Sequence, residues 1–128
     1  MKLLLDTHTI LWWINEHEKL SAVVKAMLLN EDNILYISIV SAWEISIKSS
    51  LGKLPGHYNG VGTFLTKIEE MPVQLLSLLP SHITANETLP FFHRDPFDRL
   101  LVAAAKTEGM TILTADENIH KYDVPFVW

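Results

Sequence analysis

The chain has 128 residues, of which 48% are hydrophobic and 20% are charged, and this composition excludes an intrinsically disordered protein. It contains no cysteine, so disulfide bonds, zinc sites built on thiolates and cysteine nucleophiles are all excluded. The formal net charge of −5 opposes the binding of a polyanion, so any contact with nucleic acid must rely on a local basic patch or a bound cation.

Uninterrupted apolar segments are short throughout the chain. The longest, residues 100–105 and 10–14, fall far below the length needed to cross a bilayer. Asp6 places a charge directly after the apolar start, which argues against a signal-peptide core. We therefore expect a soluble protein of the cytoplasm with no membrane partner. The length predicts one domain, residues 1–128, because a chain of this size buries enough surface for its own core.

Strand-like and helix-like patterns alternate along the chain. Strands are predicted over residues 2–5, 34–38, 73–77, 111–113 and 125–128, the last at a sheet edge. Helices are predicted over residues 9–15, 21–31, 41–51, 63–71, 80–88, 96–108 and 116–121, with a glycine-rich loop over 52–62. Ser21 and Gly109 are suited to cap two of these helices. Short strands that alternate with helices indicate an α/β fold around a parallel sheet.

Four acidic residues stand close to the junctions between these elements. They are Asp6 after the first strand, Glu44 and Asp98 in the first turns of their predicted helices, and Asp116 shortly after strand 111–113. Each position also has a local explanation. Residues 41–44 and 114–117 match capping boxes, Asp95 before Pro96 suits an N-cap, and Asp6 could cap the helix that follows it.

Taken together, the four acids indicate one shared site. In a parallel sheet with right-handed crossovers, the carboxyl ends of all strands lie at one edge, where ligand sites form. Two carboxylates about 4 Å apart repel each other by roughly 4 kcal/mol at an effective dielectric constant of about 20. Such a cluster therefore requires protonation or a bound cation. Because no histidine or cysteine is assigned to it, it favours Mg²⁺ or Mn²⁺, and metal-assisted phosphoester hydrolysis is the leading hypothesis.

Four segments that contain these acids follow one another in a recognisable order. They read Leu3-Leu-Leu-Asp-Thr-His8, Ser41-Ala-Trp-Glu-Ile-Ser-Ile-Lys48, His93-Arg-Asp-Pro-Phe-Asp-Arg-Leu-Leu101 and Thr111-Ile-Leu-Thr-Ala-Asp116. Together they resemble the PIN-domain family, and more specifically the VapC-type ribonuclease toxins of type II toxin–antitoxin systems. The resemblance implies a PIN-like three-layer α/β/α sandwich with a central parallel sheet of four or five strands. It also implies a Mg²⁺- or Mn²⁺-dependent endoribonuclease that acts on RNA, forms a homodimer and is silenced by a cognate antitoxin protein.

The same resemblance assigns roles to individual residues. Three acids would bind the metal directly or through water: Asp6, Asp98 and Asp116. Glu44 would position or deprotonate the attacking water, or complete the outer shell of the metal. Thr114 corresponds to the family's small hydroxyl residue near the last acid, and Asp95 is an extra acid that acts first as a cap and then as support for the site.

Three basic residues are candidates for holding RNA phosphates: Lys48, Arg94 and Arg99. The alternative for Lys48 is an ion pair with Glu44 one helical turn away, and for both arginines a solvated surface pair. Trp12 and Trp13 could stack on bases, although their place in an apolar run favours burial in the core or in a dimer.

Two other functions compete with the ribonuclease. The run Asp6-Thr-His-Thr after the first strand partly fits the Asp-x-Asp-x-Thr motif of haloacid-dehalogenase-like Mg²⁺-dependent phosphatases, but His8 replaces its second acid. The other competitor is a catalytically silent PIN module that binds RNA without cutting it. The six histidines include no pair at zinc-ligand spacing, and surface or supporting roles are expected for His8 and His93.

Overall fold

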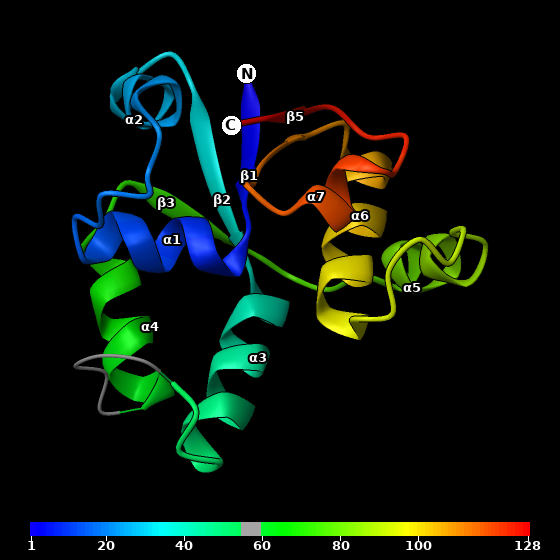
Figure 1. Ribbon diagram of the computed structural model, residues 1–128, viewed down its shortest axis with the longest axis horizontal. Helices are drawn as coiled ribbons and strands as arrows, with labels where there is room; N and C mark the ends of the chain where they lie inside the picture. Colours follow the sequence, from blue (N-terminus) through cyan, green and yellow to red (C-terminus); the bar gives the residue numbers. More distant parts are fainter. Residues whose placement is uncertain (55–59) are drawn as a thin grey trace.

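A parallel sheet forms the centre of the computed structural model, which describes residues 1–54 and 60–128 (Figure 1). Its strands are β1 (Lys2–Leu5), β2 (Ile34–Ser38), β3 (Val73–Leu76), β4 (Thr111–Leu113) and β5 (Phe126–Val127). They lie in the order β3-β2-β1-β4-β5, and every neighbouring pair is parallel. The predicted parallel sheet is therefore confirmed, and β5 is an edge strand as expected.

Helices cover both faces of this sheet and complete a three-layer sandwich (Figure 1). On one face lie α1 (Thr7–Ile14), α2 (Ala22–Leu29), α3 (Ile39–Ser50) and α4 (Val61–Glu69). On the other lie α5 (Pro80–Glu87), α6 (Pro96–Glu108) and α7 (Glu117–His120). Among the helices of residues 1–54 and 60–128, none has the length and apolar character that crossing a membrane requires.

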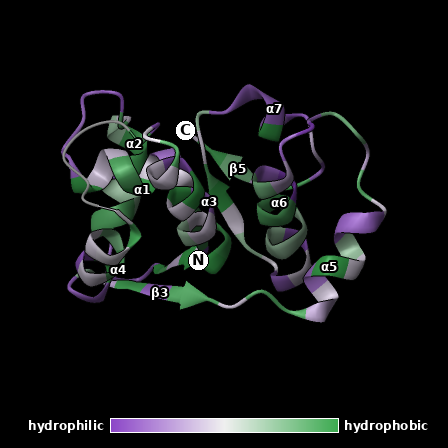
Figure 2. Cartoon of the chain, turned by 90° about the horizontal axis from the view of Figure 1, so that it is seen from below, coloured by the Kyte–Doolittle hydropathy of each residue, from purple (hydrophilic) through white to green (hydrophobic). Residues whose placement is uncertain are grey.

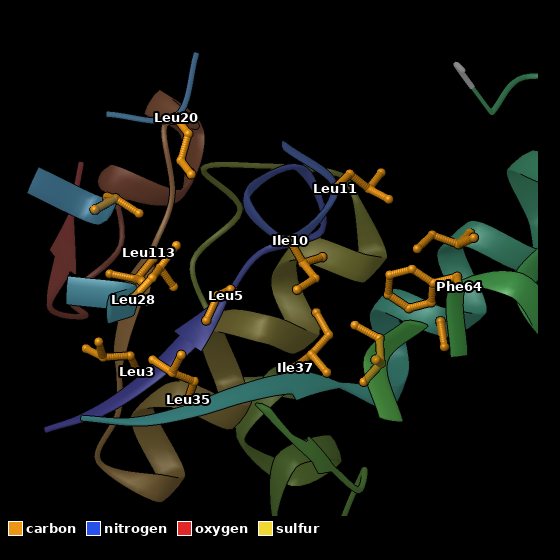
Figure 3. Close-up of a cluster of buried hydrophobic side chains, with 14 residues drawn as sticks. Leu3, Leu5, Ile10, Leu11, Leu20, Leu28, Leu35, Ile37, Phe64 and Leu113 are labelled. Atoms are coloured by element: carbon orange, nitrogen blue, oxygen red, sulfur yellow. The ribbon is translucent and has the colours of Figure 1, made fainter. Parts of the chain in front are cut away.

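Side chains of the strands alternate between two hydrophobic clusters, one on each face of the sheet. Leu3 and Leu5 of β1 join the cluster under α1 to α4, together with Ile10 and Phe64, as Figure 3 shows. Leu4 points to the opposite face and packs with residues of α6 and α7. Hydrophobic residues gather around the sheet in Figure 2, whereas the segment that leads into α7 is hydrophilic. The period-two alternation of β1 thus explains why an uninterrupted apolar run serves two cores.

Trp12 and Trp13 are partly buried against the cluster under α1 to α4, which agrees with the expected burial. The indole of Trp12 also stands next to the ring of Trp128, with 5.5 Å between their centroids. Both tryptophans therefore contribute to packing in this fold.

Helix boundaries agree with the sequence patterns to within two residues at either end. α6 spans residues 96–108 as predicted, because Asp95 caps its first turn and Gly109 ends it in the left-handed conformation, with φ 66° and ψ 42°. α3 begins at Ile39 rather than at Ser41, and Ser38 is its N-cap. α4 begins at Val61, two residues before the predicted start. Residues 55–59 of the predicted 52–62 loop lie outside the described residues.

Candidate functional site

The sheet order places β1 in the middle, between β2 and β4, so three strand ends meet around the residue that follows β1 (Figure 1). That residue is Asp6, whose side chain is only 3% exposed. Asp6 Oδ1 accepts a hydrogen bond of 2.8 Å from the amide of Thr9 and so caps α1. The chain leaves β1 toward β2 on one side while β4 lies on the other, and ligand sites of open α/β sheets form at such a point.

Thr114 follows β4 and joins two of the acids. Its fully buried hydroxyl donates a short hydrogen bond to Asp6 Oδ2 and accepts one of 3.0 Å from the amide of Asp116. Asp116, rather than Thr114, is the N-cap of α7, because its Oδ1 accepts from the amide of Asn118 at 2.8 Å. The predicted capping box over residues 114–117 is therefore wrong, and the Thr114 hydroxyl serves the site instead of a helix end.

Glu44 reaches the same region from α3, which follows β2. Because α3 begins at Ile39, Glu44 lies beyond the first turn, and the predicted capping box over residues 41–44 is wrong. Glu44 is nevertheless 4% exposed. Its Oε1 accepts a hydrogen bond of 2.7 Å from the hydroxyl of Thr7, which also lies 2.9 Å from Ser41 Oγ. Its Oε2 pairs with Lys48 Nζ. Glu44 is therefore a buried acid that is held by side chains and has no part in a helix cap.

Asp98 stands in the first turn of α6, where the Oδ1 atom of the N-cap residue Asp95 accepts a hydrogen bond of 3.1 Å from its amide. The Asp98 side chain faces His93, with 2.9 Å between Oδ2 and the ring nitrogen Nε2. The same nitrogen is 3.9 Å from Asp116 Oδ2. Candidate ligand atoms of His93, Asp98 and Asp116 all lie within 4.8 Å of one another. His93 therefore lies directly beside these acids, which agrees with the supporting role expected for it near the site.

The environment of Asp98 opposes its ionisation. Burial, followed by the charge of Asp95, raises its pKa from 3.8 to about 7, and the charges of Asp6 and Glu44 act in the same direction. The hydrogen bond with His93 partly offsets this effect. The charges of Asp6 and Glu44, which come from two other segments of the chain, thus act on the carboxyl group of Asp98.

Asp6 is perturbed in the same direction. Burial raises its pKa, while hydrogen bonds from Thr114 and Thr9 act against that rise. A carboxyl group in this position gains from any cation that can approach it, because the cation replaces lost hydration.

The site is open to the surface through a pocket of about 330 Å³. Its walls come from α1, from the α1–α2 connection and from the segment after β4, and consist of Asp6, His8, Trp12, Lys19, Ala115 and Asp116. Two of the four acids therefore line one pocket that a ligand can enter.

These residues fit a small divalent cation. The donors brought together are carboxylate oxygens, which Mg²⁺ and Mn²⁺ accept, and one imidazole nitrogen, which transition-metal ions accept. Burial and repulsion from neighbouring acids also raise the pKa of the Asp98 carboxyl, so a bound cation would offset the electrostatic cost of ionising it.

The three basic candidates differ in their surroundings. Lys48 forms the predicted ion pair with Glu44, and Arg94 is exposed. Arg99 is 5% exposed, and its two terminal nitrogens donate to the carbonyls of Asn86, Leu89 and Pro90 and to the hydroxyl of Tyr122. We therefore correct the expected phosphate contact of Arg99, because its guanidinium is already used to hold the loop before α6.

This chain is similar to known proteins over nearly its full length. The model of the PIN domain family matches residues 3–125. The curated protein "Ribonuclease VapC22" of Mycobacterium tuberculosis is 27% identical over 123 residues, which cover 95% of this chain and 92% of that protein.

Solved structures share the fold over nearly the full length. VapBC2 from Rickettsia felis, bound to a DNA fragment from its promoter, is 17% identical with a TM-score of 0.75, and the match covers 100% of this chain and 99% of that one. DNA-bound VapBC from Salmonella typhimurium is 12% identical with a TM-score of 0.71, covering 99% and 97%. VapBC-1 from nontypeable Haemophilus influenzae is 17% identical with a TM-score of 0.68, also covering 99% and 97%.

Proposed function

The chain belongs to the PIN domain family, and on that premise we propose that it is an endoribonuclease toxin of a toxin–antitoxin pair that hydrolyses RNA phosphodiester bonds. The observation that carries the proposal is the closeness of acids from separate segments: the charges of Asp6 and Glu44 act on Asp98, and His93 lies between Asp98 and Asp116. The similarity to Ribonuclease VapC22 supports RNA as the substrate. The phosphatase alternative is not retained, because the family match covers nearly the whole chain and His8 stands where that class needs its second acid.

Mg²⁺ or Mn²⁺ is the cofactor that we propose, held by Asp6, Asp98 and Asp116 directly or through water. When bound, such an ion lowers the pKa of a coordinated water and offsets negative charge on the phosphate. Thr114 fixes the orientation of Asp6 and the start of the Asp116 turn, so two of these acids keep a constant separation. Asp95 contributes by capping α6 and by raising the pKa of Asp98.

Glu44 is the residue that we assign to the attacking water, which it would orient or deprotonate. The hydroxyl of Thr7 and the ammonium group of Lys48 fix its two oxygens. A general base needs such a fixed direction because proton transfer requires hydrogen-bond distance to the water.

We assign contact with RNA phosphates to Arg94 and Lys48. Arg94 is exposed beside the loop that carries His93, and Lys48 is half-buried next to Glu44. Both are close in sequence to the acids, so they can supply locally the positive charge that the chain lacks overall. The bound metal ion would supply the remaining positive charge.

We further propose a cognate antitoxin protein, a homodimer and the cytoplasm as the setting of this activity. The antitoxin is supported by the similar solved structures, which are VapBC complexes. An antitoxin would silence the enzyme most directly by covering the pocket that Asp6 and Asp116 line.

Cleavage of RNA by the purified, folded chain tests this proposal. Asp6→Asn keeps the shape of the cap but removes the charge, and it should abolish cleavage that depends on added Mn²⁺. The matched control is Asp32→Asn, which changes an exposed acid in the turn before β2 and should cut at the wild-type rate. Undiminished cleavage by Asp6→Asn, with contaminating nucleases excluded, would contradict the assignment. Tight RNA binding without products at any Mn²⁺ concentration would instead identify a silent RNA-binding module.

A further inference from the structure

His93 extends the acidic site with a nitrogen atom. Its ring nitrogen Nε2 lies between two carboxylates, 2.9 Å from Asp98 Oδ2 and 3.9 Å from Asp116 Oδ2. Within residues 1–54 and 60–128, these three residues are the one group of acids and histidines whose ligand atoms come close enough to share a cation. The imidazole is half-buried, so the surrounding chain limits the directions in which it can turn.

Buried polar side chains hold the backbone of His93 in place. Its amide donates a hydrogen bond of 3.1 Å to the hydroxyl of Tyr122, and that hydroxyl also lies 3.5 Å from the carbonyl oxygen of His93. Arg99 in turn donates to the Tyr122 hydroxyl at 3.1 Å and to the carbonyl of Pro90 at 2.9 Å. A buried guanidinium is costly unless it is fully hydrogen-bonded. Here its hydrogen bonds fix the start of the loop that carries His93, together with the Tyr122 hydroxyl that contacts His93.

Arg99 also follows Asp98 directly in α6, so the same helix turn positions the carboxylate and the support of the imidazole. The arrangement keeps the imidazole at a constant place relative to both carboxylates, which a ligand of a metal ion requires.

We propose that His93 is a ligand of the divalent cation, through Nε2, beside the carboxylates of Asp98 and Asp116. This inference rests on the proposed function, which places a cation among the acids. It changes the ligand set from oxygen alone to oxygen and nitrogen. The hydrogen bond between Asp98 Oδ2 and His93 Nε2 joins the two atoms that a cation shared by these residues would contact.

A nitrogen ligand has a consequence for metal preference. Mg²⁺ is bound almost entirely by oxygen and gives up its waters reluctantly, whereas transition-metal ions accept imidazole nitrogen. The site should therefore prefer Mn²⁺ over Mg²⁺. Replacing His93 should weaken Mn²⁺ binding by roughly 10- to 100-fold and Mg²⁺ binding by much less.

The test is pulsed electron paramagnetic resonance of Mn²⁺ bound to the full chain, which detects directly coordinated ¹⁴N nuclei and needs no activity. His93→Gln keeps a polar side chain that can still hydrogen-bond to Asp98. His17→Gln is the matched control. It makes the same substitution at a histidine outside the group of His93, Asp98 and Asp116, in the connection between α1 and α2, where His17 stacks on Trp12. Calorimetric titrations with Mn²⁺ and Mg²⁺ give the affinities of the same three proteins.

The proposal expects a ¹⁴N coupling in the wild-type protein and in His17→Gln that is lost in His93→Gln. Bound Mn²⁺ without any ¹⁴N coupling, or a coupling that persists in His93→Gln, would overturn the role of His93 and leave the proposed nuclease intact. Failure of the wild-type chain to bind Mn²⁺ at all would remove the metal site, and with it both proposals.

Discussion

Replacing Asp98 with asparagine should stabilise the metal-free protein above neutral pH. Burial and the charge of Asp95 raise the pKa of Asp98 to about 7, against 3.8 for an ordinary aspartate. Because the folded chain then binds the proton more tightly than the unfolded chain, the free energy of unfolding is highest below about pH 4 and falls as the pH rises to about 7. Above about pH 7 the stability that protonated Asp98 contributes is lost completely.

The magnitude follows from the size of the rise in pKa. A change from 3.8 to about 7 corresponds to about 4 kcal/mol, which is an upper limit because the side chain keeps some contact with water. Its exposed fraction is 16%, so solvent screens only part of the effect. Asp98→Asn removes this ionisation, and the variant should therefore show a weaker pH dependence than the wild-type protein. A slope of the same sign should remain, because burial also raises the pKa of Asp6.

Urea unfolding of chelator-treated protein between about pH 4 and about pH 8 measures these changes. Asp123→Asn is the matched control, since this exposed acid lies in the turn before β5. A divalent cation should restore stability to the wild-type protein but not to Asp98→Asn, by about 2.7 kcal/mol at 100 times its dissociation constant. Equal pH dependence in wild type and Asp98→Asn would refute the electrostatic description of the site.

Three further changes probe other contacts. Thr114→Val loses the hydroxyl that serves Asp6, so it should destabilise the fold by about 1–3 kcal/mol in thermal unfolding and reduce RNA cleavage, while Thr114→Ser retains both. Glu44→Gln keeps its shape but cannot accept a proton, so single-turnover cleavage should fall by roughly 10²- to 10⁴-fold with little change in Mn²⁺ affinity. Arg99→Lys cannot reproduce the forked hydrogen bonds and should destabilise the chain by about 2 kcal/mol, whereas Arg94→Lys, at an exposed position, should leave stability unchanged.

Much of the sheet and its acidic edge could be predicted because the signals are local. β1 is a short apolar run that ends at an acid, and α6 has a proline at its first position and a glycine after its last. The alternation of strands and helices then brings the acids to one edge by the topology of parallel sheets.

The capping and site interpretations of the acids prove compatible, although the sequence presents them as alternatives. One oxygen of Asp6 accepts from the amide of Thr9, and the other accepts from Thr114. Asp116 likewise uses Oδ1 for the cap of α7 and turns Oδ2 toward His93. A carboxylate has two oxygens, so a helix cap can also orient a ligand.

The start of α3 was mispredicted because its local signals are ambiguous. Ile39 and Val40 are β-branched and extend the strand pattern of β2, while Ser38 and Ser41 are both suitable caps. The structure selects Ser38, which frees Ser41 to lie against Thr7. Tertiary packing across 34 residues decides this boundary, and a sequence pattern does not contain that contact.

The surroundings of Arg99 and His93 could not be predicted from the spacing of residues in the sequence. Their roles depend on Tyr122, which lies 23 residues from one and 29 from the other along the chain. An arginine next to an acid in a helix is typical of a surface pair, and only the folded loop shows that this one is enclosed.

Anomalous scattering from crystals of the wild-type chain grown with Mn²⁺ would locate the proposed metal site. A manganese peak should appear beside the carboxylates that we propose as ligands, and the same crystals of Asp6→Asn should show it weakened or absent. A manganese peak bound only elsewhere on the molecule, or no peak at all beside these acids, would contradict the account.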